Sequence, residues 1–112
     1  MSTAWEQFQG ATLLLARSGS IKDRLTDAFR NHLSQVQEDD LPREIREQFC
    51  SVCRSLTSER PQRGEDAVRA SVRKLSSRDA DLIASSVVEM LAVIPRAPAR
   101  STGPAPLYLV EA

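Results

Sequence analysis

The two cysteines of the segment FCSVCRSL are the residues whose type and spacing most resemble a chemical site. Cys50 and Cys53 stand three positions apart, the spacing with which thiolates bind a metal ion or exchange a disulfide. A structural zinc site needs four Cys or His ligands, and His32 is the only other such residue. A redox pair would open a helix that follows a strand, whereas these cysteines fall inside a predicted helix. We therefore interpret them as small buried hydrophobic residues, with metal or redox use as the weaker alternative.

His32 is the only side chain whose ordinary pKa lies near neutrality, which makes it the one candidate general base. It lies near the middle of an apolar stripe, beside Ala28 and Phe29, and no nucleophile motif accompanies it. We interpret it as a core or interface histidine whose nitrogen finds a backbone or carboxylate partner. The acids at 38–40 lack the spacing and glycine of a calcium loop, and helix capping explains them. No catalytic or nucleotide-binding motif occurs, so we predict no enzyme activity, no cofactor and no metal.

The elements that would hold these residues are helices, because apolar residues recur at spacings of three and four almost throughout. Gly19 is expected to end the first helix, and Pro95 to stop the last. Asp40 and Pro42 mark the start of the third, as cap and first-turn residue. The predicted fold is all-α: a single irregular bundle of four to five helices over residues 1–94. The expected helices span 3–17, 20–36, 41–56, 65–75 and 76–94.

The overall composition limits the classes of partner. A chain of 112 residues fits one domain, and its 15 basic and 15 acidic side chains cancel. This balance removes the surplus positive charge on which nonspecific binding to DNA or to an anionic membrane depends. The N-terminal sequence resembles neither a signal peptide nor a membrane span, and two cysteines do not make a secreted disulfide framework. We expect a soluble cytoplasmic protein that does not bind membranes.

The segment 95–112 differs in composition from the predicted helices. It is rich in Pro and Ala up to Pro106, which is typical of a linker, and we expect it to be largely unstructured. Beyond it lies a compact apolar cluster, which holds the only tyrosine and could dock on a partner by extended pairing or by filling a groove. The alternatives are a frayed terminus or an end that folds back over its own bundle. The predicted partner-binding residues of this tail are Leu107, Tyr108, Leu109 and Val110.

The first predicted helix carries apolar residues around most of its circumference. Leu13 and Leu14 project away from the stripe formed by Phe8 and Leu15, and together with Trp5 these residues cover most of the helix surface. Such a helix is either central in the bundle or has one face covered by a partner protein or by a second copy of the chain, as in a homodimer. Trp5, Leu13 and Leu14 are therefore our second set of candidate partner-binding residues.

Basic residues gather between residues 54 and 78, and Arg69, Arg73, Lys74 and Arg78 form the one patch suited to phosphate. One observation argues against phosphate binding. A spacing of four residues separates Glu65, Arg69 and Arg73, and this spacing favours a ladder of ion pairs on a solvated helix face. The loop before residue 65 is also too long for a helix-turn-helix. The sequence thus predicts a noncatalytic protein-interaction or regulatory protein, and the alternative is a nucleic-acid-associated regulator that uses this basic patch.

Overall fold

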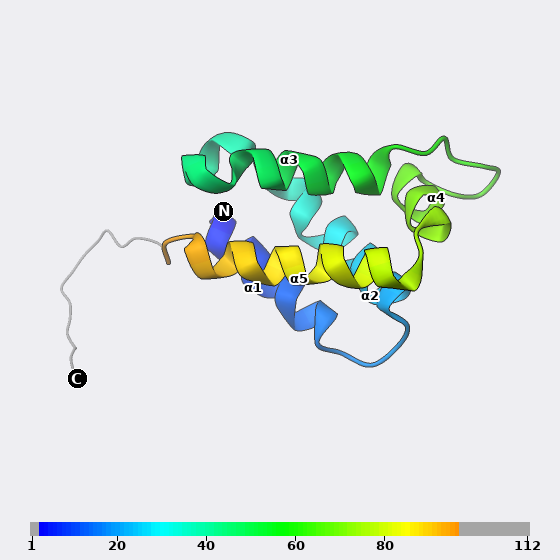
Figure 1. The fold of residues 1–112 in the computed structure, drawn as a ribbon, viewed down its shortest axis with the longest axis horizontal. Coiled ribbons are helices and arrows are strands. Elements are labelled where there is room, and N and C mark those ends of the chain that lie inside the picture. The colour runs from blue at the N-terminus through cyan, green and yellow to red at the C-terminus, as the bar shows by residue number, and fades with distance from the viewer. Residues whose placement is uncertain (1–2, 97–112) are drawn as a thin grey trace.

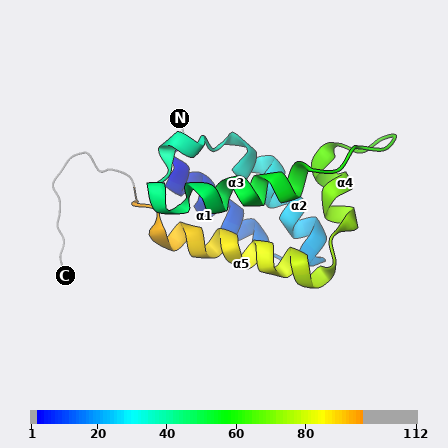
Figure 2. The same cartoon turned by 45° about the horizontal axis from the view of Figure 1, so that its top comes forward.

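The computed structural model describes residues 3–96, and within that range the chain forms helices and no strands. The predicted all-α bundle is confirmed. The two longest helices, α3 and α5, run side by side; α4 lies across one end, and α1 and α2 pack against α5, behind it in the view of Figure 1 (Figures 1 and 2). The elements are α1 (Ala4–Leu15), α2 (Ile21–Asn31), the 3-10 helices η1 (Leu33–Gln35) and η2 (Glu38–Asp40), α3 (Arg43–Thr57), α4 (Ala67–Lys74) and α5 (Ser77–Val93).

Side-chain caps fix where most helices begin. Thr3 and Glu6 form a reciprocal capping box at α1, in which the Thr3 Oγ1 accepts from the Glu6 N–H at 3.1 Å. Ser20 and Ser76 cap α2 and α5 through hydroxyl oxygens that accept from the N–H groups of Asp23 and Asp79, and Asp66 caps α4. The prediction that Asp40 caps the third helix is wrong, because Asp40 lies in η2 and Pro42 is the N-cap residue of α3.

The predicted helix 20–36 is too long, because α2 ends at Asn31. His32 leaves the helical conformation, with φ −132° and ψ −59°, and its ring reaches α1, where Nδ1 lies 2.8 Å from the Gln7 Oε1. Ser34 then donates to the carbonyl of Arg30, so a side chain competes with the backbone for the last helical acceptors. The chain continues as the short 3-10 turn η1, which still buries Leu33.

The core lies where α1, α3 and α5 meet, and its centre is an aromatic pair. Phe8 is fully buried, and its ring centroid lies 5.8 Å from that of Phe49 at an interplanar angle of 53°. The other buried side chains of this core are not aromatic. Fully burying one such side chain stabilises the fold by about 1.5–3 kcal/mol. The surrounding buried residues include Leu25, Leu33, Leu56, Val87 and Met90.

The turn between α1 and α2 is held by one side chain of α2. Arg24 donates from Nε to the carbonyl of Gly19 at 3.0 Å and from Nη1 to the carbonyl of Leu15. Gly19 has φ +112°, a conformation that side-chain-bearing residues rarely adopt, so the turn requires glycine there. A cation from the second helix therefore satisfies the carbonyl end of the first, which has no basic residue in its own last turn.

Candidate interaction site

The surroundings of both cysteines favour the thiol over the thiolate. Cys53 packs against the core, and burial raises the pKa of its thiol to about 11. The half-buried Cys50 thiol donates to the Glu38 Oε1 at 3.1 Å, and this hydrogen bond raises its pKa as well. The interpretation as a buried hydrophobic residue fits Cys53, whereas Cys50 makes a polar contact at the surface. Residues 3–96 contain no group of three or more His, Cys, Asp or Glu side chains that could hold a metal ion.

His32 is half-buried and fills space beside α1. Its nitrogen partner is the side-chain amide of Gln7 rather than the backbone or carboxylate group that we expected. The imidazole ring also stands directly over Gly10, at a place where a Cβ atom would overlap it. The geometry gives His32 a packing role between η1 and α1.

Three of the four basic residues of the predicted patch form ion pairs with carboxylates. Arg73 makes two hydrogen bonds to Glu65, at 2.8 and 3.2 Å, and they lower the pKa of that carboxyl. Lys74 lies 3.8 Å from Glu59. Arg78, at the start of α5, is exposed and has no ion pair among the described residues.

The predicted ladder of Glu65, Arg69 and Arg73 forms only in part. Glu65 precedes the first turn of α4 and reaches Arg73 alone. Arg69 turns instead to Asp23 of α2, at 3.2 Å. The four predicted cations thus lie on α4 and at the start of α5, but most of their charge is already neutralised by acids of the same molecule.

The three apolar residues singled out on α1 do not form one surface. Trp5 and Leu14 are half-buried and pack against the core, whereas Leu13 is 62% exposed. The guanidinium of Arg96 lies 4.8 Å from the Trp5 ring centroid and covers it further. Because α1 packs against both α2 and α5, it fits the description of a central helix, with Leu13 alone projecting into solvent.

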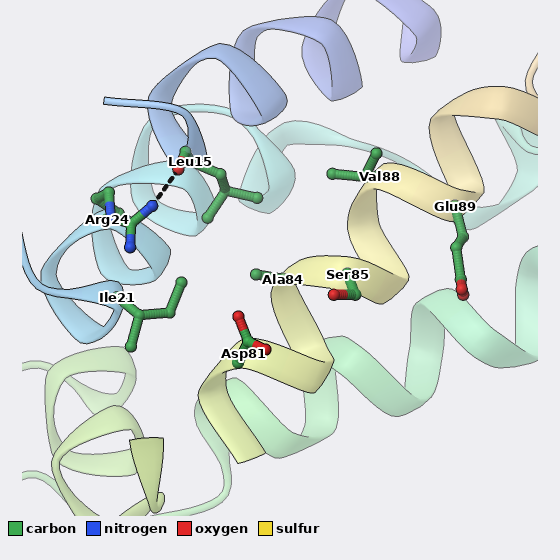
Figure 3. A pocket seen from close by; sticks show the side chains of 8 residues that line it. All are labelled: Leu15, Ile21, Arg24, Asp81, Ala84, Ser85, Val88 and Glu89. Atoms are coloured by element: carbon green, nitrogen blue, oxygen red, sulfur yellow. Dashed lines mark hydrogen bonds between the residues drawn. The ribbon is translucent and has the colours of Figure 1, made fainter. Parts of the chain in front are cut away.

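A groove of about 430 Å³ that the sequence does not predict lies between the end of α1, the start of α2 and the middle of α5. In Figure 3, Leu15 and Ile21 face Ala84 and Val88 across the hollow. Arg24 stands at the α2 side, and polar residues of α5 complete the lining: Asp81, Ser85 and Glu89. The available signal was Val88, an apolar residue outside the buried stripe of α5 and 45% exposed.

The remaining predicted residues, Leu107, Tyr108, Leu109 and Val110, lie outside the described part of the chain. Within residues 3–96, no helix has the length and apolar character needed to cross a membrane. Comparison of the chain with protein-family models, with curated proteins and with solved structures gave no match. The geometry described above is therefore the basis on which a function is proposed.

Proposed function

We propose that this protein is noncatalytic and binds a partner protein through the exposed face of α1 around Leu13 and through the terminal segment 107–110. The observation that carries the proposal is the exposure of Leu13, at 62%, in a helix whose other leucines are buried or half-buried. Its neighbours on the same face are polar or small: Glu6, Gln9, Ala16 and Arg17. An apolar centre with a polar rim is the arrangement found in protein interfaces.

The state of the titratable groups supports a noncatalytic role. Both thiols have raised pKa values, which lowers the fraction of nucleophilic thiolate. The single histidine is engaged with Gln7 and packs on α1. The proposal includes a cytoplasmic location, where both cysteines would remain thiols.

The test compares two exposed leucines. Leu13→Glu adds a charge at the proposed anchor, and Leu82→Glu, at a residue 56% exposed on α5, is the matched control. Full-length proteins are immobilised and incubated with source-cell lysate, and captured proteins are identified and then purified for a direct binding measurement. We expect Leu13→Glu to weaken binding of the purified partner at least tenfold and Leu82→Glu to leave it unchanged.

The contribution of the tail has its own variant. Replacing Leu107 and Leu109 together by Ser leaves the bundle sequence intact and should also weaken binding. If the captured protein is a second copy of the chain, sedimentation of the purified protein will show a concentration-dependent dimer. Equal binding by the wild type, Leu13→Glu and the tail variant would contradict the proposal.

The ion pairs favour a protein partner over the nucleic-acid alternative. A phosphate at Arg69 or Arg73 would have to displace the carboxylate that each already holds. Titration with random-sequence duplex DNA at low salt compares the two proposals directly. Binding that falls steeply with salt and is weakened by Arg69→Gln with Arg73→Gln would support the alternative. We expect no such binding.

A further inference from the structure

The groove between α1, α2 and α5 has an apolar floor and one unpaired cation. Leu15 and Ala84 are buried at its base, while Val88 is 45% exposed. Arg24 has no carboxylate within 4.0 Å among residues 3–96, and its guanidinium is held in place by two backbone carbonyls. Asp81 and Glu89 also line the groove, on the α5 side, so it suits an apolar occupant whose acidic group lies at the Arg24 end.

The described part of the chain ends close to the same pair of helices. Arg96 follows α5 and lies over Trp5, near the start of α1, so the chain leaves the bundle where these two helices meet. The groove opens farther along the same pair, where Leu15 of α1 faces α5 (Figure 3). Ser85, in the middle of the groove, precedes Arg96 by eleven residues, a rise of roughly 16 Å at helical spacing.

The length of chain beyond Arg96 is sufficient to reach the groove. Ten residues, 97–106, separate Arg96 from the apolar segment, and ten extended residues span at most roughly 33 Å. This reach is about twice the distance required. A linker of this length also keeps the segment at an effective concentration of roughly millimolar near the groove, so weak contacts suffice for occupancy.

The chemistry of the terminal segment matches the groove. Leu107, Tyr108, Leu109 and Val110 supply four consecutive apolar or aromatic side chains, and Glu111 follows them directly. A hollow of about 430 Å³ falls in the size range of small-ligand pockets, which can admit one or two such side chains. With the apolar residues on the floor, the carboxylate of Glu111 would be within reach of the unpaired Arg24.

We propose that the groove is the docking site for residues 107–111 of the same chain. The terminal segment then has two uses, self-docking and partner binding, which compete with each other. A partner must displace the segment from the groove before it can bind the segment, which makes the docked form autoinhibited. The self-docking itself does not require the proposed function, because it rests only on residues of this chain.

The only tyrosine of the chain provides the test. In nuclear Overhauser spectra of the full-length protein, the ring protons of Tyr108 are expected to show contacts with methyl groups of Val88, Ile21 or Leu15. A mixture of isotope-labelled and unlabelled chains separates contacts within one molecule from contacts between two. Absence of any contact between Tyr108 and these methyl groups overturns the proposal, and so do contacts found only between molecules.

Two valines of α5 give a matched pair of variants. Val88 lines the groove and Val93 does not, yet their exposures are 45% and 48%. We expect Val88→Glu to abolish the Tyr108 contacts and Val93→Glu to retain them. An equal effect of both variants, or no effect of either, contradicts docking in this groove.

A change in the tail alone avoids any effect on folding of the bundle. Tyr108→Ser is expected to shift the backbone amide resonances of Ser85 and Val88 while leaving those of residues 58–66 unchanged. Unchanged groove resonances would overturn the proposal. This outcome is independent of the partner-binding test, because the resonances of the groove are measured on the protein without a partner.

Discussion

The apolar centre and the ionic corner of this bundle are held by different forces. The apolar centre is the core around Phe8 and Phe49, where α1, α3 and α5 meet. The ionic corner is α4 with residues 59–66, and every ion pair of the described residues involves it. These pairs are Arg30–Asp66, Asp23–Arg69, Glu65–Arg73 and Glu59–Lys74.

The two regions make different contributions to folding. Burial of apolar area stabilises the folded state in proportion to the area, whereas exposed ion pairs contribute little because water screens them. The partners of Arg30 and Arg69 lie on different elements, so these pairs constrain where α4 sits against α2. Burial therefore sets the stability of this fold, including that of α4 through Val68 and Val72, while the ion pairs add surface contacts between α4 and α2.

Removing an aromatic ring from the apolar centre is the largest expected change. Phe8→Ala leaves a cavity beside Phe49 and should lower the free energy of unfolding by about 3–5 kcal/mol. Urea denaturation followed by circular dichroism measures this change. A loss no larger than that caused by removing an ion pair would contradict the division between the two regions.

The apolar centre should also protect a thiol. With a pKa of about 11 against an ordinary 9.0, Cys53 has roughly a hundredth of the usual thiolate near neutral pH. We expect iodoacetamide at pH 7.5 to alkylate Cys53 at least a hundredfold more slowly in the folded protein than in urea. Peptide mass spectrometry follows both cysteines separately. Equal rates for Cys53 in the two states would show that its burial is transient.

A smaller effect is expected where α1 meets His32. In Gly10→Ala, overpacking against the imidazole costs about 1–3 kcal/mol, which exceeds the gain of about 1 kcal/mol from better helix propensity. The variant should therefore unfold at lower urea concentration than the wild type. In a His32→Ala background the sign should reverse, because the obstructing ring is gone. Stabilisation by Gly10→Ala in both backgrounds would contradict this contact.

Acid should weaken the ionic corner through Asp66. The Arg30 guanidinium lowers the pKa of Asp66 to about 2, against an ordinary 3.8 in the unfolded chain. The stabilisation is therefore complete above about pH 4 and is lost as the pH falls toward 2. Asp66→Asn keeps a capping side chain and removes the charge, so it should lack this part of the acid dependence. Identical pH profiles of thermal unfolding for wild type and variant would contradict the assignment.

The smallest effect is expected for a single exposed ion pair. Arg73→Gln should lower the midpoint of thermal unfolding only slightly, and by less at high salt, because screening weakens the pair that it removes. Arg78→Gln is the control, since Arg78 has no ion pair among the described residues. A large, salt-independent loss for Arg73→Gln would show that the ionic corner stabilises the fold as strongly as the centre.

Local sequence signals were sufficient for the features that depend on neighbours along the chain. The Ser20 and Ser76 caps, and the buried stripe of α3 that contains Phe49, follow from spacing alone. The end of α2 does not, because it depends on a contact between His32 and α1 that sequence periodicity cannot show. The helical spacing of Glu65 and Arg69 likewise predicted an ion pair between them. In the structure Arg69 instead pairs with Asp23, which is distant in sequence.

The candidate site was predictable only in part. The apolar excess of α1 was visible in the sequence, but which of Trp5, Leu13 and Leu14 remains exposed depends on how α1 packs against two other helices. The groove could not be predicted, because it is formed by three segments that are distant in sequence and by the angle at which they meet. Only Val88, apolar and outside the buried stripe of α5, pointed to it.

The contact of Arg24 with the end of α1 has a consequence for amide hydrogen exchange. Because a side chain of α2 satisfies the carbonyls of Leu15 and Gly19, the last turn of α1 cannot fray without releasing it. The two helices should then open as one cooperative unit, with similar protection at the end of α1 and in the first turns of α2. In Arg24→Met, which keeps an unbranched side chain but has no N–H donors, exchange at the end of α1 should become faster than in α2.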